Sequence, residues 1–241
     1  AASDVYKRQS IISIYDTQVT DADSQYMKVA DLDNSYVLNK GDMVIATGKI
    51  YGTSGAIDYG TITNRTVANF IDNNYEIFET NLSCMKDDYG FLFNSDGNVV
   101  GISQVNSDSK LKAIGISDLK CMIECMINRQ GKMYFGIVAQ NVDSELSEKN
   151  GIPMGIYISK VDNDSPAYQA GLQPGDIIQG INKMPCYSIQ RLNDKIYDSS
   201  AGQVINVSIK RKGKSGYFDA SYDVSVELRS VSYTHLRAHE T

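Results

Sequence analysis

The sequence predicts a mainly β protein in which a helix joins two β-rich modules. Short runs of β-branched and aromatic residues, separated by turn residues, fill residues 43–102. A helical pattern of apolar residues follows Ser117, and strand signals resume at Lys132. Short strands at regular spacing are typical of a barrel or a sandwich, and an apolar repeat near 3.6 residues is typical of an amphipathic helix.

Strand and turn signals define the first module. Met43–Ala46 is a short apolar run between glycines, which predicts a buried strand. Residues 60–63 and 75–78 are further short strands rich in β-branched and aromatic residues. Residues 91–102 predict a β-hairpin, because the Asp96-Gly97 pair in the turn tolerates positive φ.

An amphipathic helix is predicted next, with Ser117 as its N-cap and Gly131 as its stop signal. Cys121 and Cys125 fall on the face opposite the apolar one. The apolar face consists of Leu119, Met122, Ile123, Met126 and Ile127. We expect this helix to link the two modules.

The second module opens with strand signals at 133–138 and 155–161. A one-turn helix is predicted after them, in which Ser165 is the N-cap and Pro166 takes the first helical position. Gly171 ends this helix in a left-handed conformation.

The rest of the module alternates turn, helix and strand signals. Pro174-Gly175-Asp176 predicts a tight turn that leads into the apolar strand Ile177-Ile178. Ser188–Tyr197 predicts a second helix with its apolar residues on one side, and residues 202–211 alternate as a closing strand does.

The charge and the composition of the chain exclude several classes of function. The formal net charge is −6 and there is no basic cluster, which argues against nucleic acid as a partner. No apolar run approaches the roughly 18 residues that a membrane span needs. The four cysteines form no Cys-x-x-Cys pair and no disulfide framework, so we expect free thiols, no metal site and no cofactor.

The two ends of the chain need separate treatment. Residues 1–9 and about 230–241 resemble the translated adapters of a transposon-based DNA sequencing library. The expectation is that the organism did not encode them and that the gene is truncated at both ends. His235 and His239 both lie in the second of these segments, so the remaining sequence offers no histidine as a base or a ligand.

The second module, residues 131–229, resembles a PDZ domain of the bacterial HtrA type. The resemblance is carried by Ser165-Pro166-Ala167, Ala170-Gly171-Leu172 and Pro174–Ile178, with Ile181-Asn182 shortly after. It implies a β-sandwich with two helices. This string marks the fold and touches no ligand.

The resemblance also implies a peptide site. Tyr134, Phe135, Gly136 and Ile137 would form a loop whose backbone N–H groups take a peptide's C-terminal carboxylate. The peptide would add as a strand beside Ile137–Ala139. Its side chains would rest against the second helix, at Ile189, Leu192 and Ile196. The alternative is that Phe135 and Ile137 only fill the core.

The first module, residues 10–130 with the linking helix, resembles the second barrel of a trypsin-like (chymotrypsin-fold) protease of the same HtrA/DegP-like family. Gly41–Gly48 matches the family's strand after Gly-Asp, and Asn94–Ile102 matches the hairpin that follows its catalytic serine. Ala113–Ile116 falls where the family's substrate-flanking strand runs. The family's first barrel, with its catalytic histidine and aspartate, would lie before the start of this chain.

The family's Gly-Asn-Ser-Gly-Gly motif is absent at the matching positions. Counting back from Asn94, these positions are Lys86, Asp87, Asp88, Tyr89 and Gly90. Asp88 stands at the nucleophile position, and a carboxylate cannot replace the serine of a serine–histidine pair. Lys86 and Asp87 replace residues of the oxyanion loop, so no catalytic residue is assigned; a salt-bridged turn without function is the default for these charges.

Two functions are therefore weighed, beside a third possibility that the PDZ domain only packs against the barrel or mediates trimer-like assembly. The first is a catalytically inactive, HtrA-like protein that binds peptide C-termini or extended segments through its PDZ domain. The alternative is an HtrA-type serine endopeptidase of envelope protein quality control. The resemblance implies an extracytoplasmic location on a bacterial surface, a membrane contact only through an N-terminal anchor outside this chain, and possible homo-oligomers.

Overall fold

The computed structural model describes residues 2–4, 9–11, 28–85, 88–104, 109–128, 131–229 and 232–233. The chain divides into two compact units. The first comprises Ala1–Ala68, Tyr75–Arg129 and Ser232–Thr241, and the second comprises Asn69–Asn74 with Gln130–Val231. A short segment between two strands of the first unit thus belongs to the second.

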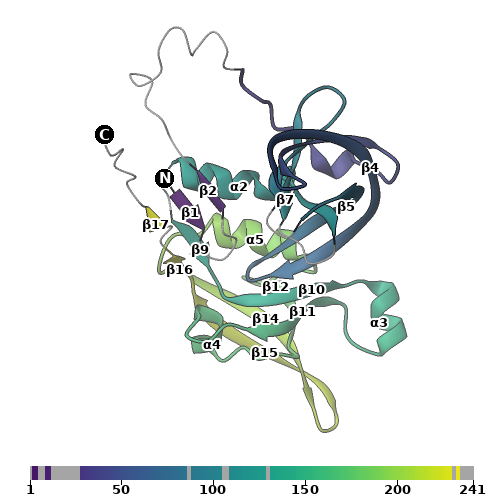
Figure 1. The fold of residues 1–241 in the computed structure, drawn as a ribbon. Helices are drawn as coiled ribbons and strands as arrows, with labels where there is room; N and C mark the ends of the chain where they lie inside the picture. Colours follow the sequence, from purple (N-terminus) through teal and green to yellow (C-terminus); the bar gives the residue numbers. More distant parts are fainter. Residues whose placement is uncertain are drawn as a thin grey trace. The chain divides into compact units, whose positions relative to one another are not determined.

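A closed antiparallel barrel forms the first unit, and its curved strands run from dark blue to teal in Figure 1. The strand order is β3-β4-β5-β8-β7-β6. These strands are β3 (Met43–Ile50), β4 (Thr53–Phe70), β5 (Asn73–Ser83), β6 (Tyr89–Phe93), β7 (Val99–Gln104) and β8 (Lys110–Gly115). The mainly β, barrel-forming character predicted for this module is confirmed.

The alternation of inward-facing and outward-facing residues along the strands explains the core of the barrel. Val44 and Ala46 of β3 point inward with Ile62, Phe78 and Leu92 from other strands, and all of them are buried. The predicted hairpin is present, with Leu92 opposite Gly101. The strands predicted at 60–63 and 75–78 are longer than expected, because polar residues continue the alternation on the outer face of β4 and β5.

The linking helix, α2, spans Ile116–Ile127 and ends at Asn128. Ser117 is not its N-cap, which is Gly115. The Ser117 hydroxyl instead accepts a hydrogen bond from the Ser35 N–H at 2.8 Å, and the Ser117 N–H donates to the Ser35 hydroxyl at 3.1 Å. The serine is therefore used to fix the helix start to the short 3-10 helix η2 (Ser35–Val37).

The second unit is a sheet in the order β10-β11-β12-β14-β15, with β13 paired to β12, and a separate pair of β9 with β16. The strands are β9 (Lys132–Tyr134), β10 (Ile137–Val142), β11 (Gly155–Val161), β12 (Ile177–Ile181), β13 (Met184–Pro185), β14 (Val204–Gly213), β15 (Gly216–Ser225) and β16 (Glu227–Arg229). The helices are α3 (Ser144–Asn150), α4 (Pro166–Ala170) and α5 (Ile189–Tyr197). Sequence patterns predicted α4 and α5 but not α3.

The residues predicted to begin and end α4 are confirmed. The Ser165 hydroxyl accepts from the Tyr168 N–H at 3.1 Å, and Gly171 ends the helix with φ of 92°. Asp176 of the following turn is buried and forms an ion pair with Arg211 at 2.7 Å. This ion pair ties the turn between α4 and β12 to β14.

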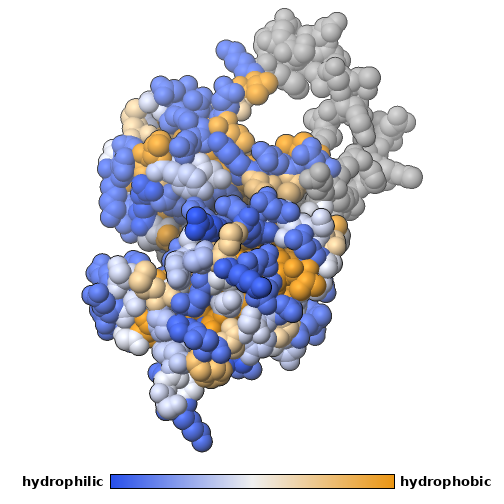
Figure 2. Space-filling view, turned by 180° about the vertical axis from the view of Figure 1, so that it is seen from behind, coloured by the Kyte–Doolittle hydropathy of each residue, from blue (hydrophilic) through white to orange (hydrophobic). Residues whose placement is uncertain are grey.

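The first unit also contains a small sheet from the chain ends, in the order β17 (Ser232–Tyr233), β1 (Ala2–Asp4) and β2 (Gln9–Ile11). The adapter resemblance of these ends stays a prediction. None of the helices in the described ranges is long and apolar enough to cross a membrane. On the face seen in Figure 2 the coloured surface is mostly hydrophilic, with apolar residues in small groups.

Candidate functional site

The loop between β9 and β10 directs three consecutive backbone N–H groups at one point. Those of Phe135, Gly136 and Ile137 donate to a single carboxylate, that of Asp72. The distances are 2.8 Å from Phe135, 2.8 and 2.9 Å from Gly136 to the two oxygens, and 2.9 Å from Ile137. Successive N–H groups that converge in this way form an anion-binding concavity.

Gly136 makes this loop possible. Its φ is +96°, and a Cβ built on it would lie 2.1 Å from the Cβ of Ser165. A side chain at position 136 is therefore excluded both by backbone strain and by the N-terminus of α4. The left-handed conformation also turns the N–H of Ile137 toward the same side as its two predecessors.

Hydrogen bonds on the outer side hold the loop in shape. The Gly136 carbonyl accepts from the Asp162 N–H at 2.8 Å, and the Phe135 carbonyl accepts from the Ala167 N–H at 2.9 Å. The Tyr134 hydroxyl donates to the Asp162 carboxylate. These contacts leave the N–H groups fixed in direction, which is the preorganisation that an anion site needs.

The structure brings the sequence-predicted residues of this site together within the second unit. Their side chains lie in its hydrophobic core: the exposed fraction is 0% for Phe135, 2% for Ile137, 5% for Ile189, 1% for Leu192 and 2% for Ile196. The polar groups that the loop offers to an anion are thus the backbone N–H groups of residues 135–137, which Asp72 occupies here. Tyr134 is half-buried and supports the loop through Asp162.

Asp72 is a site residue that sequence reasoning missed. It lies between β4 and β5, in the segment Asn69–Asn74 that belongs to the second unit. The only signal was its place in an Asp-Asn-Asn turn. Its φ is +54°, a left-handed conformation that aspartate tolerates better than most residues.

Asp88, predicted to occupy a degenerate nucleophile position, is 3% exposed in the first unit. Its carboxylate accepts from the backbone N–H groups of Met85 at 2.6 Å, Tyr51 at 2.8 Å and Gly52 at 3.0 Å. Burial opposes ionisation, but these hydrogen bonds outweigh it and lower the pKa of Asp88 below its usual value. Lys86 and Asp87 lie outside the described residues.

Among the described residues near Asp88, neither Cys84 nor Ser83 has the surroundings of an activated nucleophile. Burial, with a smaller effect from Asp88, raises the pKa of the half-buried Cys84 thiol, which disfavours the reactive thiolate. Ser83 is exposed on the barrel surface. The part of the chain that the structure describes contains no histidine that could serve either of them as a base.

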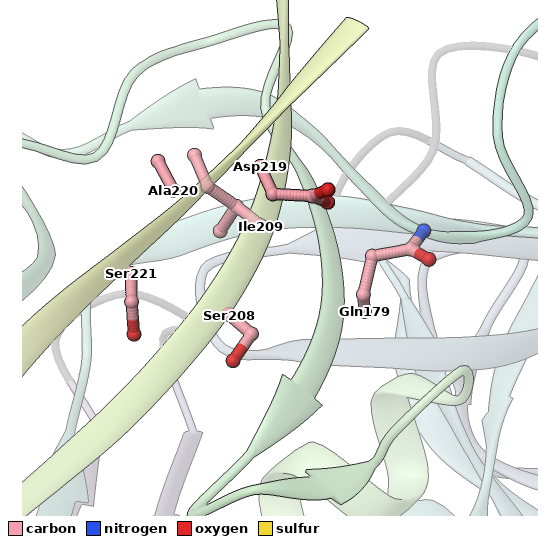
Figure 3. Close-up of a pocket in the computed structure, with 6 residues that line it drawn as sticks. All are labelled: Gln179, Ser208, Ile209, Asp219, Ala220 and Ser221. Carbon is pink, nitrogen blue, oxygen red and sulfur yellow. The ribbon is translucent and has the colours of Figure 1, made fainter.

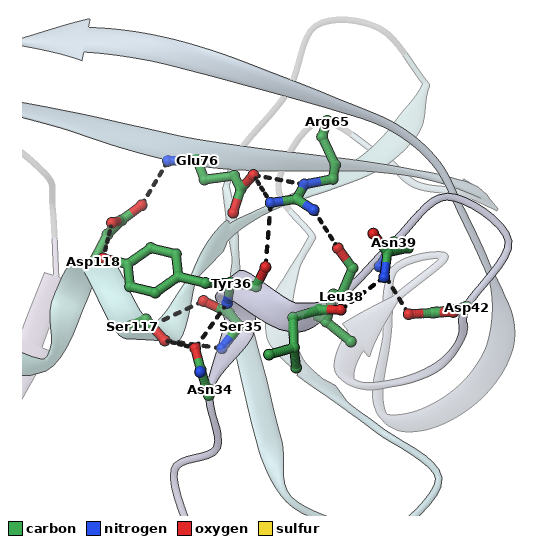
Figure 4. A network of polar contacts seen from close by, with 11 residues as sticks. Asn34, Ser35, Tyr36, Leu38, Asn39, Asp42, Arg65, Glu76, Ser117 and Asp118 are labelled. Carbon is green, nitrogen blue, oxygen red and sulfur yellow. Dashed lines mark hydrogen bonds and ion pairs between the residues drawn. The ribbon is translucent and has the colours of Figure 1, made fainter.

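A polar network at the start of α2 is structural (Figure 4). The Asp118 carboxylate accepts from the Glu76 N–H at 2.6 Å and from the Tyr36 hydroxyl at 2.7 Å. Arg65 donates to Glu76 at 2.6 Å and to the Leu38 carbonyl at 2.6 Å. Asp118, Glu76 and Arg65 each have hydrogen-bond partners within the barrel unit, so the network joins η2, β4, β5 and α2.

A shallow hollow on the second unit offers no catalytic arrangement (Figure 3). It is lined by Gln179, Ser208, Ile209, Asp219, Ala220 and Ser221. Asp219 is paired with Lys210 at 2.8 Å, and the Ser221 hydroxyl donates to Asn206 at 2.9 Å. Within the described ranges, no three histidine, cysteine, aspartate or glutamate side chains are placed to share a metal ion.

Comparison with known proteins supports a PDZ domain in the second unit, although the matched range also includes β7, β8 and α2 of the first unit. A family model described as PDZ domain matches residues 99–221. Curated relatives include the probable periplasmic serine endoprotease DegP-like of Pseudomonas putida (strain W619), 27% identical over 223 residues. The protein of the same description from Hahella chejuensis is 26% identical over 226 residues.

These matches cover 86% and 88% of this chain but only 45% and 46% of the relatives. The chain therefore spans about half the length of the curated relatives it matches.

Solved structures show the same fold. The HtrA-type protease AlgW with tripeptide has a TM-score of 0.58 and 24% identity, over 84% of this chain and 70% of that one. The serine endoprotease from Yersinia pestis has a TM-score of 0.53 and 24% identity, over 86% of this chain and 69% of that one. The chain belongs to the PDZ domain family, and it is similar in sequence to DegP-like proteins and in fold to HtrA-type proteases.

Proposed function

We propose that the second unit binds peptide C-termini or extended peptide segments. The observation that carries this proposal is the convergence of the Phe135, Gly136 and Ile137 N–H groups on one carboxylate. A loop that holds a side-chain carboxylate with three backbone donors has the chemistry to hold a terminal carboxylate. One solved relative is described as an HtrA-type protease with tripeptide, which supports a peptide as the ligand class.

The remaining contacts follow from the position of β10. This strand stands at one end of the sheet order, so a peptide would add to it as an antiparallel strand beside Ile137–Ala139. The helix α5 would supply the apolar side, through Ile189, Leu192 and Ile196. Tyr134 would act indirectly, by holding the loop through Asp162.

A comparison of free and amidated peptides tests this function. Fluorescent peptides with an apolar C-terminal residue are titrated against the full chain, and anisotropy gives the Kd. We expect micromolar binding of the free acid and a loss of about tenfold or more on amidation, because the amide removes the charge that the loop receives. Equal affinity of the two forms would rule out the carboxylate loop as the site.

The proposal includes loss of serine catalysis in the barrel. It is supported by Asp88, whose buried carboxylate is held by three backbone N–H groups at the position matched to the nucleophile. A second candidate is a serine endopeptidase, and the names of the relatives favour it: they are serine endoproteases. Because this chain spans about half of the curated relatives, the activity of the whole protein is open to either.

A serine-reactive phosphonate separates the two candidates. Applied to the longest gene product that contains this sequence, it should leave the protein unlabelled if the barrel is inactive. Labelling that is lost on denaturation and mapped to a serine of the barrel would establish the endopeptidase. An active relative labelled in parallel controls for the reagent.

The location proposed is outside the cytoplasmic membrane, since the curated relatives are described as periplasmic. An N-terminal anchor and a homo-oligomeric assembly belong to the same proposal through the family resemblance. Fractionation of the source cells with an antibody to residues 131–229 tests the location. Recovery in the cytosol would contradict it.

A further inference from the structure

We infer that Asp72 is a built-in ligand of the carboxylate loop, and that a peptide binds only by displacing it. The inference rests on the proposed function of this loop as a peptide site. It follows from what the segment Ile71–Asn73 touches, and not from the loop alone.

The segment contacts each element to which a bound peptide is assigned. Ile71 pairs with Val138 of β10 as an antiparallel bridge, and the Asp72 N–H donates to the Ile137 carbonyl at 2.7 Å. On the other side, the side-chain oxygen of Asn73 accepts a hydrogen bond from the side-chain amide of Asn193 in α5 at 3.3 Å. The segment therefore lies beside β10, contacts α5 and places the Asp72 carboxylate in the loop. A short bound peptide would make the same three kinds of contact.

The carboxylate in the loop belongs to the side chain of Asp72, because the backbone does not end there but continues into β5. A free peptide would present its terminal carboxylate from the main chain. Here the left-handed backbone of Asp72, with φ of +54°, reverses the chain while the side chain faces the loop. Asp72 is 7% exposed, so little of the residue remains open to solvent.

Occupancy by Asp72 and by a peptide is mutually exclusive. All three donors of the loop bond to Asp72, and the Gly136 N–H is shared by both of its oxygens. A second carboxylate at the same point would have no free donor and would meet a like charge. The apparent Kd of a peptide therefore equals its intrinsic Kd divided by the fraction of molecules in which Asp72 has left the loop.

Two substitutions test the inference. Asp72→Asn keeps the shape and tolerates the left-handed backbone but removes the charge, whereas Asp72→Gly removes the side chain and relieves the backbone. Asp96→Asn is the matched control, because Asp96 lies exposed in the β6–β7 turn. The probe is a fluorescent peptide with a free C-terminal carboxylate, titrated against the full chain.

We expect both Asp72 variants to bind the peptide about tenfold or more tightly than the native sequence, and the Asp96 variant to bind it unchanged. Without peptide, amide hydrogen exchange at residues 135–137 should accelerate in Asp72→Gly and stay unchanged in Asp96→Asn. Thermal unfolding of each variant establishes that it is folded; Asp72→Asn carries the test if Asp72→Gly does not fold.

The outcomes separate this inference from the function on which it rests. Unchanged exchange at residues 135–137, or unchanged peptide affinity in a folded Asp72 variant that binds the peptide, overturns the built-in ligand. Accelerated exchange with no peptide binding in any variant supports the Asp72 contact and overturns the peptide function instead.

Discussion

Asp72 of the second unit and Asp88 of the first are both buried aspartates held by three backbone N–H groups. Their donors differ. Asp88 bonds its own turn at Met85 and the β3–β4 turn at Tyr51 and Gly52, in which both residues have positive φ. The donors of Asp72 belong to a loop that other contacts already hold in shape.

The difference separates a structural carboxylate from a ligand-like one. Without Asp88, three backbone N–H groups lose their charged acceptor, and the turn at Tyr51 and Gly52, where both residues have positive φ, loses its support. Without Asp72, the loop keeps its Gly136 geometry and its outer hydrogen bonds. We therefore expect Asp88 to contribute mainly to the free energy of unfolding and Asp72 to act mainly on the affinity for a peptide.

Asp88→Ala should give the largest effect on stability. Three hydrogen bonds to a buried carboxylate that ties two turns together would be lost, at a cost of about 3 kcal/mol. Asp72→Ala should cost less, about 1 kcal/mol, because the outer hydrogen bonds keep the loop in shape and a water molecule can take the place of the carboxylate as acceptor. Urea unfolding of both variants measures the difference, and equal losses would break the distinction between the two carboxylates.

Gly136→Ala should come next, at about 2 kcal/mol, with loss of peptide binding. The new Cβ would meet Ser165 and would hold a positive φ. Gly175→Ala is the matched control: its φ is +95° but no atom lies within 4 Å of its Cβ, so only backbone strain of about 1 kcal/mol is expected. Equal unfolding free energies for the two variants would show that Ser165 does not confine the loop.

The pH dependence of stability should show the smallest effect. The pKa of Asp88 is lower in the folded chain than in the unfolded chain, so the unfolded state takes up its proton first as the pH falls. The stability that Asp88 contributes is complete above the unfolded pKa, about 4, and is lost as the pH falls below it.

The difference in unfolding free energy between the native sequence and Asp88→Asn should therefore shrink between about pH 5 and pH 3. Asp96→Asn, measured in parallel, corrects for exposed carboxylates. A difference that grows as the pH falls would contradict the assignment of Asp88.

Local signals predicted much of the fold. The cap of α4 at Ser165, its end at Gly171 and the hairpin turn at Asp96-Gly97 depend on residues that are near in sequence, and each is present. The start of α2 was misplaced because Ser117 bonds Ser35, which is 82 residues away. No local pattern reports such a partner.

The candidate site shows the same limit. The glycine that shapes the loop, Gly136, could be named from the sequence because its conformational role is local. Asp72 could not, since its acceptor role depends on donors 63 to 65 residues away. The contacts of Asp88 with Tyr51 and Gly52 were invisible for the same reason.

The central claim is that the backbone of residues 135–137 receives a peptide carboxylate. The most direct test follows the amide signals of Phe135, Gly136 and Ile137 in the isotope-labelled Asp72→Asn chain during titration with one peptide as free acid and as amide. The account predicts that these three signals shift together with the free acid and remain in place with the amide. Signals that stay unmoved by the free acid, or move equally with both peptides, would contradict it.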